Sequence, residues 1–262
     1  MYIKPKKGLG QNFLVDKNVQ NKIIKACAFS PQDVVLEVGA GTGEFTRLIA
    51  EEAAFVCALE IDDALCEDLR KNLKKYKNVS VICQDFLKFD FNAYFLRHPG
   101  KIKVFGNIPY YITSPIIERI FESKNKIDTV FLTVQKEFAQ RILARAGTKE
   151  YGSFTCFIEY FAEPKKFFYI KKNSFYPAPK VDSCFLQLSI RENPPVLLKD
   201  EKLFFKIIRA AFNQRRKTLK NSLKEVIPRK NIEDFLKMRG LDQNIRPENL
   251  SLEDFAFLVN TG

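Results

Sequence analysis

The chain has 262 residues, of which 46% are hydrophobic and 28% charged, a balance typical of a folded globular protein and not of a disordered one. No apolar run is long enough to cross a membrane, and the basic first residues lack the apolar stretch of a signal peptide, so we expect a cytoplasmic protein without a membrane partner. The net charge is +12, yet residues 31–100 carry twelve acidic and eight basic side chains, as expected if one part holds a small cationic ligand and the rest meets a polyanion.

From about residue 16 to residue 135, short apolar runs alternate with stretches of helical spacing. The runs are rich in β-branched and aromatic residues and predict buried strands at 33–38, 55–60, 79–83 and 103–105. Helices are predicted between them at 43–53 and 62–76, and the second begins at Asp62, where acidic residues favour a helix N-terminus. Further strands at 128–135, 155–161 and 183–190, with a helix at 136–146, would complete seven strands. The alternation predicts an α/β fold with a mostly parallel sheet.

Tandem prolines at 194–195 interrupt both helix and sheet and predict a domain boundary. Beyond them the spacing is helical, at 200–212, 218–226, 231–238 and 251–259. The last helix begins with Ser251 and Asp254 three residues apart, a capping box. We therefore expect a first domain of residues 1–192 and a small helical domain of residues 193–262.

A glycine loop follows the first predicted strand and opens a helix, in the stretch Glu37-Val-Gly39-Ala-Gly41-Thr-Gly43. Glycines there allow a tight turn and a close approach of ligand to backbone. Glu60 ends the next strand, where it can accept hydrogen bonds from two ribose hydroxyls, and Asp85 ends the third strand, where it can accept from an adenine amine. Dinucleotides and S-adenosylmethionine both use such a loop, and the G-x-G-x-G spacing after Glu37 favours the methyl donor. One histidine and six scattered cysteines leave no good metal site.

A second motif, Asn107-Ile108-Pro109-Tyr110, follows the fourth predicted strand. An adenine N6 amine is a poor nucleophile, because its lone pair is delocalised into the ring. The carboxamide oxygen of Asn107 and the carbonyl of Ile108 can each accept one N–H and aim that lone pair, while Tyr110 stacks on the flipped base. The motif therefore predicts direct transfer of a methyl group to the amine, without a covalent enzyme intermediate.

Two later stretches are candidates for contact with nucleic acid. Residues 173–183 contain two prolines that stiffen a loop and can present Phe175 as the second face of a base sandwich. Residues 206–224 carry seven basic side chains and no acidic one. The candidates for phosphate contacts in it are Arg215, Arg216, Lys217 and Lys220.

In these motifs the sequence closely resembles the small-subunit ribosomal RNA adenine dimethyltransferases (the KsgA type). The matching stretches span nearly the whole chain in the family's order: 10–14, 37–43, 107–110, 175–183 and 212–223. The resemblance implies a Rossmann-like class I methyltransferase fold with a small helical C-terminal domain. It also implies a role in ribosome biogenesis, dimethylating two adjacent adenosines in the 3′-terminal hairpin loop of small-subunit RNA, presented by a partly assembled subunit to a monomeric enzyme.

The resemblance assigns contacts with S-adenosylmethionine to six residues, namely Asn12, Leu14, Gly39, Glu60, Asp85 and Asn107. Asn12 and Leu14 rest on the resemblance alone, whereas Gly41 is added from the glycine loop. The family often has leucine in place of Ile108 and a glycine-proline-glycine loop in place of Gly39-Ala-Gly41, and both changes are mild.

Three alternatives stay open at this point. Large-subunit RNA dimethylases of the macrolide-resistance type also carry Asn-x-Pro-Tyr, although the basic stretch 212–223 favours the small-subunit enzyme. A non-catalytic nucleic-acid-binding relative, like the mitochondrial transcription factors that share this architecture, is disfavoured by the intact Glu60, Asp85 and Asn107. A DNA adenine methyltransferase is disfavoured by the basic tail.

Overall fold

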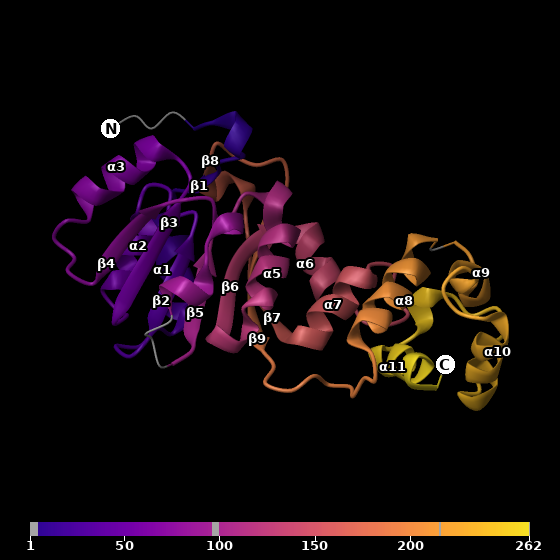
Figure 1. The fold of residues 1–262 in the computed structure, drawn as a ribbon. Coiled ribbons are helices and arrows are strands. Elements are labelled where there is room, and N and C mark those ends of the chain that lie inside the picture. Colours follow the sequence, from indigo (N-terminus) through magenta and orange to yellow (C-terminus); the bar gives the residue numbers. More distant parts are fainter. Residues whose placement is uncertain (1–4, 96–99, 215, 262) are drawn as a thin grey trace. The chain divides into compact units, whose positions relative to one another are not determined.

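The computed structural model describes residues 5–95, 100–214 and 216–261. The chain folds into two compact units (Figure 1): the sheet unit, which comprises residues up to 139 together with 165–190, and the helical unit, which comprises 140–164 together with residues from 191 onward. The domain boundary predicted after residue 192 stays a prediction. The helical unit also takes in residues 140–164, which precede the end of the sheet. No helix among the described residues is both long and apolar enough to cross a membrane.

A seven-stranded sheet forms the sheet unit, in the order β4-β3-β2-β5-β6-β9-β7. The first five strands of this order run parallel to one another, and β9 runs antiparallel to β6. The strands are β2 (Val34–Val38), β3 (Phe55–Glu60), β4 (Val79–Cys83), β5 (Ile102–Gly106), β6 (Ile127–Gln135), β7 (Ala162–Ile170) and β9 (Ser183–Ile190). This is the α/β, mostly parallel sheet that the sequence predicts.

A second, two-stranded sheet joins segments that are far apart in the chain. In it β1 (Phe13–Leu14) pairs antiparallel with β8 (Phe175–Tyr176). The N-terminal segment is thereby fixed to the loop that leads into β9.

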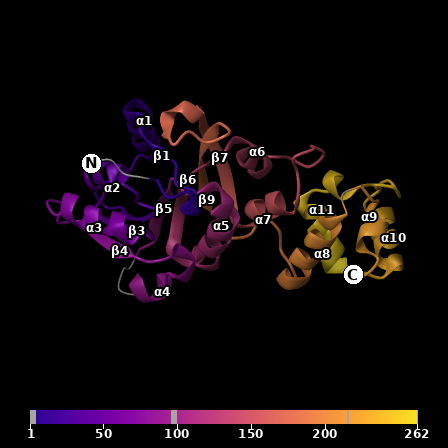
Figure 2. The ribbon, with the colours of Figure 1, turned by 90° about the horizontal axis from the view of Figure 1, so that it is seen from above.

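Helices cover both faces of the large sheet (Figure 2). Buried residues of α1 and α2 pack with one face of the strands, in an apolar cluster that contains Phe105, Phe131 and Phe185, and α4 and α5 lie on the other side. The α-helices of the sheet unit are α1 (Lys17–Cys27), α2 (Glu44–Ala50), α3 (Asp63–Asn72), α4 (Phe91–Tyr94) and α5 (Thr113–Glu122), and α6 (Lys136–Ile142) continues into the helical unit. The short 3-10 helices are η1 (Lys7–Leu9), η2 (Phe86–Lys88), η3 (Tyr110–Ile112), η4 (Lys124–Lys126), η5 (Lys172–Ser174) and η6 (Pro247–Asn249).

The helical unit has its own apolar core, which contains Phe204, Phe235 and Phe255. Its α-helices are α7 (Ser153–Phe161), α8 (Glu201–Asn213), α9 (Leu219–Leu223), α10 (Arg229–Met238) and α11 (Leu252–Thr261). The capping box predicted for the last helix is present, because the Ser251 hydroxyl accepts the Asp254 N–H at 3.2 Å and the Asp254 carboxylate accepts the Ser251 N–H at 3.0 Å.

One predicted strand is wrong. Residues 155–161 form the helix α7, and the missing strand of the sheet is β7, which begins at Ala162. Thr155, Cys156 and Tyr160 are buried on α7, where the latter two join the core of the helical unit. An apolar run of this length cannot distinguish a buried strand from a buried helix by its spacing alone.

Candidate active site

A pocket opens where the parallel strands β2, β3, β4 and β5 end, at the edge of the sheet where ligands bind in open α/β folds. It holds about 1100 Å³ of empty space, part of it open to solvent. Its walls come from four parts of the sheet unit: residues 9–14, 38–45, 59–61 with 84–87, and 107–116. All the predicted donor-binding residues lie in these walls, namely Asn12, Leu14, Gly39, Gly41, Glu60, Asp85 and Asn107.

The glycine loop between β2 and α2 forms one wall. Gly39, Gly41 and Gly43 have φ angles of +73°, +57° and +81°, a left-handed conformation that glycine adopts without strain. The N–H groups of Gly39 and Ala40 both donate to the carbonyl of Leu59, at 2.8 and 3.0 Å, which ties the loop to β3. A β-carbon at Gly39 would meet no atom within 4 Å, so the backbone there faces open space. The loop is thus shaped for close approach of a ligand.

Glu60 holds the loop in this shape. The residue is 5% exposed, and its Oε2 accepts the N–H of Gly41 at 2.8 Å. Oε1 accepts the N–H groups of Ile61 and Asp62 at 2.9 and 3.0 Å. A carboxylate oxygen accepts about two hydrogen bonds, so Oε1 is filled and Oε2 keeps one acceptor position. The bond to Gly41 is a role for Glu60 that its sequence position did not reveal.

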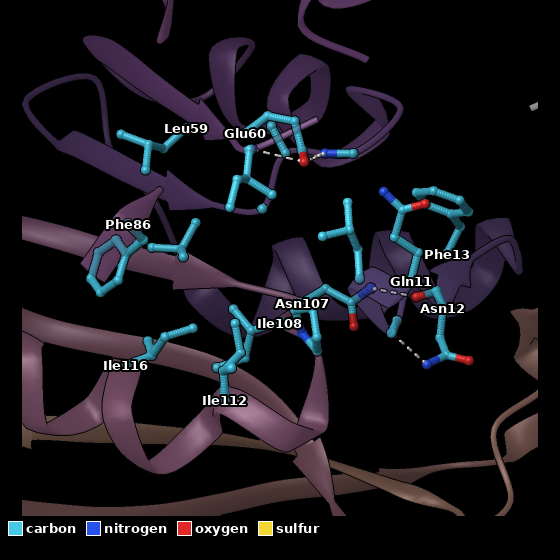
Figure 3. A pocket seen from close by; sticks show the side chains of 18 of the residues that line it. Gln11, Asn12, Phe13, Leu59, Glu60, Phe86, Asn107, Ile108, Ile112 and Ile116 are labelled. Atoms are coloured by element: carbon cyan, nitrogen blue, oxygen red, sulfur yellow. Dashed lines mark hydrogen bonds between the residues drawn. The ribbon is translucent and has the colours of Figure 1, made fainter. Parts of the chain in front are cut away.

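The pocket has one largely apolar side (Figure 3). Leu59, Phe86, Ile108, Ile112 and Ile116 lie together there, whereas Gln11, Asn12 and Asn107 lie at the other end. Asp85 caps η2 by accepting the N–H of Leu87 at 2.9 Å, which fixes its carboxylate at the rim. An apolar slot bordered by a carboxylate suits a flat heterocycle that carries an amine.

The N-terminal segment closes the pocket on the polar side. Its polar residues bond to Asp62, a buried side chain that also caps α3: Lys6 Nζ lies 2.7 Å from Asp62 Oδ1, and Gln11 Nε2 lies 3.4 Å from Oδ2. Phe13 packs against the glycine loop, since a β-carbon at Gly41 would lie 3.1 Å from its ring. Lys6 and Asp62 were not predicted as site residues.

Asn107 follows β5 and points into the pocket (Figure 3). Its Nδ2 donates to the main-chain carbonyl of Asn12 at 3.2 Å. Because a carbonyl only accepts, this bond fixes the amide nitrogen toward the N-terminal segment and leaves the amide oxygen facing the pocket. The next residue, Ile108, is buried, and its side chain packs close to Gly106, where a β-carbon would meet it at 2.8 Å.

Tyr110 is held by Ser183 at the start of β9. The two hydroxyl oxygens are 2.5 Å apart, and Ser183 is fully buried. Burial raises the pKa of the Tyr110 hydroxyl, an effect that the hydrogen bond to Ser183 partly offsets. The ring of Tyr110 therefore lines the pocket in a fixed position as a neutral phenol. Ser183 ends the proline-containing stretch 173–183, but its contact with Tyr110 was not predicted.

Glu37 is a buried acid beneath the glycine loop. Its Oε2 has no hydrogen-bond partner among the described residues, and it is 2% exposed. Burial raises the pKa of Glu37 to about 8; the nearby Thr46 side chain partly offsets this effect, and the Glu60 carboxylate adds to it. Glu37 is consequently protonated at neutral pH and supplies no negative charge to the pocket.

Phe175 does not lie in the pocket wall. It is 4% exposed and belongs to the apolar cluster that includes Phe105 and Phe131, whereas the following residue, Tyr176, is 48% exposed. The structure thus brings Asn107 and Tyr110 together and leaves Phe175 in the core.

Three of the predicted phosphate contacts lie in the helical unit, Arg216 and Lys217 between α8 and α9 and Lys220 within α9. Arg216 and Lys217 are exposed, and Lys220 donates to the side chain of Gln243 at 3.0 Å. Arg215 lies outside the described residues.

Comparisons with known proteins agree with this geometry. A family model described as ribosomal RNA adenine dimethylase matches residues 3–261. A protein of Caldanaerobacter subterraneus subsp. tengcongensis, named ribosomal RNA small subunit methyltransferase A, is 44% identical over 262 residues, 98% of this chain and 97% of the relative. The protein of that name from Clostridium botulinum is 42% identical over 253 residues, 96% of this chain and 92% of the relative.

Two solved structures are similar over nearly the whole chain. A dimethyladenosine transferase from Plasmodium falciparum has a TM-score of 0.80 at 28% identity and covers 94% of this chain and 95% of its own. The 23S rRNA methyltransferase ErmE has a TM-score of 0.74 at 28% identity, with 94% and 98% covered.

Proposed function

The chain belongs to the ribosomal RNA adenine dimethylase family, and on this basis we propose that it dimethylates N6 of two adjacent adenosines in the 3′-terminal hairpin loop of small-subunit RNA. Its methyl donor is S-adenosylmethionine, and it acts in the cytoplasm as a monomer on a partly assembled subunit. The sequence identities support the small subunit as the substrate. Two relatives named ribosomal RNA small subunit methyltransferase A are 42 and 44% identical to this chain, whereas the 23S rRNA methyltransferase ErmE is 28% identical. The observation that supports this proposal most strongly is the hydrogen bond from Asn107 to Asn12, which orients the Asn107 amide in a pocket beside the glycine loop.

The pocket fits the methyl donor along its length. The open backbone at Gly39 and the free acceptor position on Glu60 suit the amino-acid part and the ribose, and Asp85 with the apolar slot suits the adenine. Asn12 and Leu14 close the pocket from the N-terminal segment. When bound, S-adenosylmethionine supplies an electrophilic methyl group on a sulfonium.

The chain's own residues prepare the target amine. The amide oxygen of Asn107 and the carbonyl of Ile108 each accept one N–H of the adenine N6, which turns the nitrogen lone pair toward the donor. The ring of Tyr110 stacks on the extruded base, and its face favours the positive charge that forms on the nitrogen. Once the new bond to nitrogen has formed, the cationic nitrogen gives its proton to solvent water at the open side of the pocket, so no strong general base is needed. Phe175 supplies the second face of the base sandwich, which requires that it move out of the apolar cluster when RNA binds.

The phosphates of the RNA are contacted by four basic residues of the helical unit, Arg215, Arg216, Lys217 and Lys220.

Mapping of methylated adenosines by mass spectrometry, after incubation of the pure protein with donor and subunits, tests the proposal. We expect two neighbouring dimethyladenosines near the 3′ end of small-subunit RNA. Labelling confined to large-subunit RNA would instead assign the macrolide-resistance activity, and failure to bind the donor in calorimetry would assign a non-catalytic binding role.

A further inference from the structure

Two lysines flank the exposed ring of Tyr169 on the sheet unit, and two more follow it closely in the chain. The proposed function uses none of these residues. We call this group the edge patch. It consists of Lys136, Lys166, Tyr169, Lys171 and Lys172.

Asp182 connects the edge patch to the active site. Its main-chain carbonyl accepts the N–H of Lys136 at 3.0 Å, and its carboxylate accepts the N–H of Lys172 at 3.0 Å. The next residue is Ser183, whose hydroxyl bonds to Tyr110. The edge patch therefore begins one residue along the chain from the contact that holds the stacking tyrosine.

The edge patch carries excess positive charge. Lys171 forms a salt bridge with Asp182, at 3.3 Å, which neutralises one of the four lysines. Lys166 and Lys172 are exposed and form no salt bridge with any acidic side chain in the part of the chain that the structure describes. Exposed lysines without counter-charges attract a polyanion such as a nucleic-acid backbone.

Tyr169 gives the edge patch an aromatic surface. It is 44% exposed, and the ammonium groups of Lys136 and Lys166 lie 5.4 and 4.8 Å from its ring centroid. Proteins that bind single-stranded nucleic acid combine these two elements, an aromatic ring for a base and nearby cations for phosphates. A target base that is flipped into the pocket leaves its neighbours unstacked and in need of such a surface.

We propose that the edge patch binds the single-stranded RNA segment adjoining the target adenosine, with Lys166 and Lys172 at its phosphates and Tyr169 beneath a base. This inference rests on the proposed function. It adds an RNA-binding surface on the sheet unit, separate from the basic residues of the helical unit.

The test uses charge reversal with a matched control. Lys166→Glu/Lys172→Glu changes two exposed lysines of the edge patch, and Lys74→Glu/Lys77→Glu changes two exposed lysines just before β4, at the opposite edge of the same sheet. For the edge-patch variant we expect affinity for a small-subunit RNA hairpin to fall about tenfold or more. The slope of the logarithm of affinity against the logarithm of salt concentration should become shallower by about one for each lost phosphate contact. The affinity for S-adenosylmethionine should not change in either variant, and the control should bind the RNA within about twofold of the wild type.

A second pair of variants tests the aromatic surface. Tyr169→Phe keeps the ring and should keep RNA affinity, whereas Tyr169→Ala should lower it at least about fivefold. If the wild type methylates small-subunit RNA and the edge-patch variant binds it no more weakly than the control, the edge-patch proposal is wrong and the proposed function stands. If the wild type methylates no ribosomal RNA at all, the proposed function has failed before the variants are compared.

Discussion

The side-chain amide of Asn107 is bonded to the main-chain carbonyl of Asn12, 95 residues earlier in the sequence. This bond orients the amide of Asn107 and anchors the N-terminal segment at the same time. Asn107→Ala should therefore lower turnover about 100-fold, because the target amine loses an oriented acceptor. Affinity for the methyl donor should fall much less, because the N-terminal segment keeps its bonds to Asp62 and its pairing with β8. Single-turnover rates and donor calorimetry measure the two effects, with the exposed Asn21→Ala as the control. A near wild-type rate in Asn107→Ala would show that the assigned role is wrong.

Glu60 accepts three main-chain N–H groups, and a glutamine at this position cannot accept all of them, since one end of its amide is a donor. Glu60→Gln should leave at least one buried N–H without a partner, at a cost of about 1–3 kcal/mol, and loosen the glycine loop. We expect donor affinity in calorimetry to fall at least about tenfold, with a lower melting temperature. Glu52→Gln, on the surface of the same unit, should leave both quantities unchanged.

The hydrogen bond between the hydroxyls of Tyr110 and Ser183 positions the Tyr110 ring, whereas the ring itself stacks on the base, so variants can test the two roles separately. Tyr110→Phe keeps the ring and loses one hydrogen bond, so the methylation rate should fall about tenfold or less. Ser183→Ala should have a similar effect, and the double variant should be little worse than either single variant, because both remove the same bond. Tyr110→Ala removes the stacking surface and should be much slower. Equal rates in Tyr110→Ala and Tyr110→Phe would argue against a stacking role.

Glu37 predicts a pH dependence of stability. Burial raises its pKa from 4.5 to about 8, so the folded protein binds a proton that the unfolded chain releases in this range. The stability that this proton contributes is fully present below about pH 4.5 and is lost as the pH rises through 8, with a slope of up to about 1.4 kcal/mol per pH unit. Glu37→Gln has no such proton, so it should match the wild type near pH 5 and exceed its stability near pH 9. Urea unfolding at several pH values measures this difference, and parallel curves for the two proteins would contradict it.

Strands buried on both faces could be predicted from the sequence because their residues are apolar almost without interruption. The run from Val34 to Val38 and the run from Phe55 to Glu60 are examples, and the structure confirms both. The strand β7 escaped prediction because it carries Pro164 and two adjacent lysines, which an edge strand tolerates but a central one does not. The preceding helix α7 was predicted as a strand. Its buried residues pack in a core with α8, which is distant in the sequence, so the local pattern does not reveal the helix.

In the site, the sequence identified the residues that belong to local motifs. Glu60 ends the strand β3 and Asn107 follows β5, so their meeting at one edge of a parallel sheet could be predicted. Lys6 and Asp62 are 56 positions apart and lie in no shared motif, so their ion pair could not be predicted. Phe175 stands before a stiff loop, but the apolar cluster that buries it is assembled from five or more separate elements that no local pattern reveals.

The pairing of β1 with β8 brings residues 13 and 14 against residues 176 and 175. During synthesis the strand β1 has no pairing partner until about two thirds of the chain has left the ribosome, although Asp62 and Asn107, which also hold the N-terminal segment, are made earlier. Incomplete chains thus lack the pairing that fixes Leu14 in the pocket wall. Acquisition of donor affinity would consequently occur late in translation, close to the moment when β9 enters the sheet.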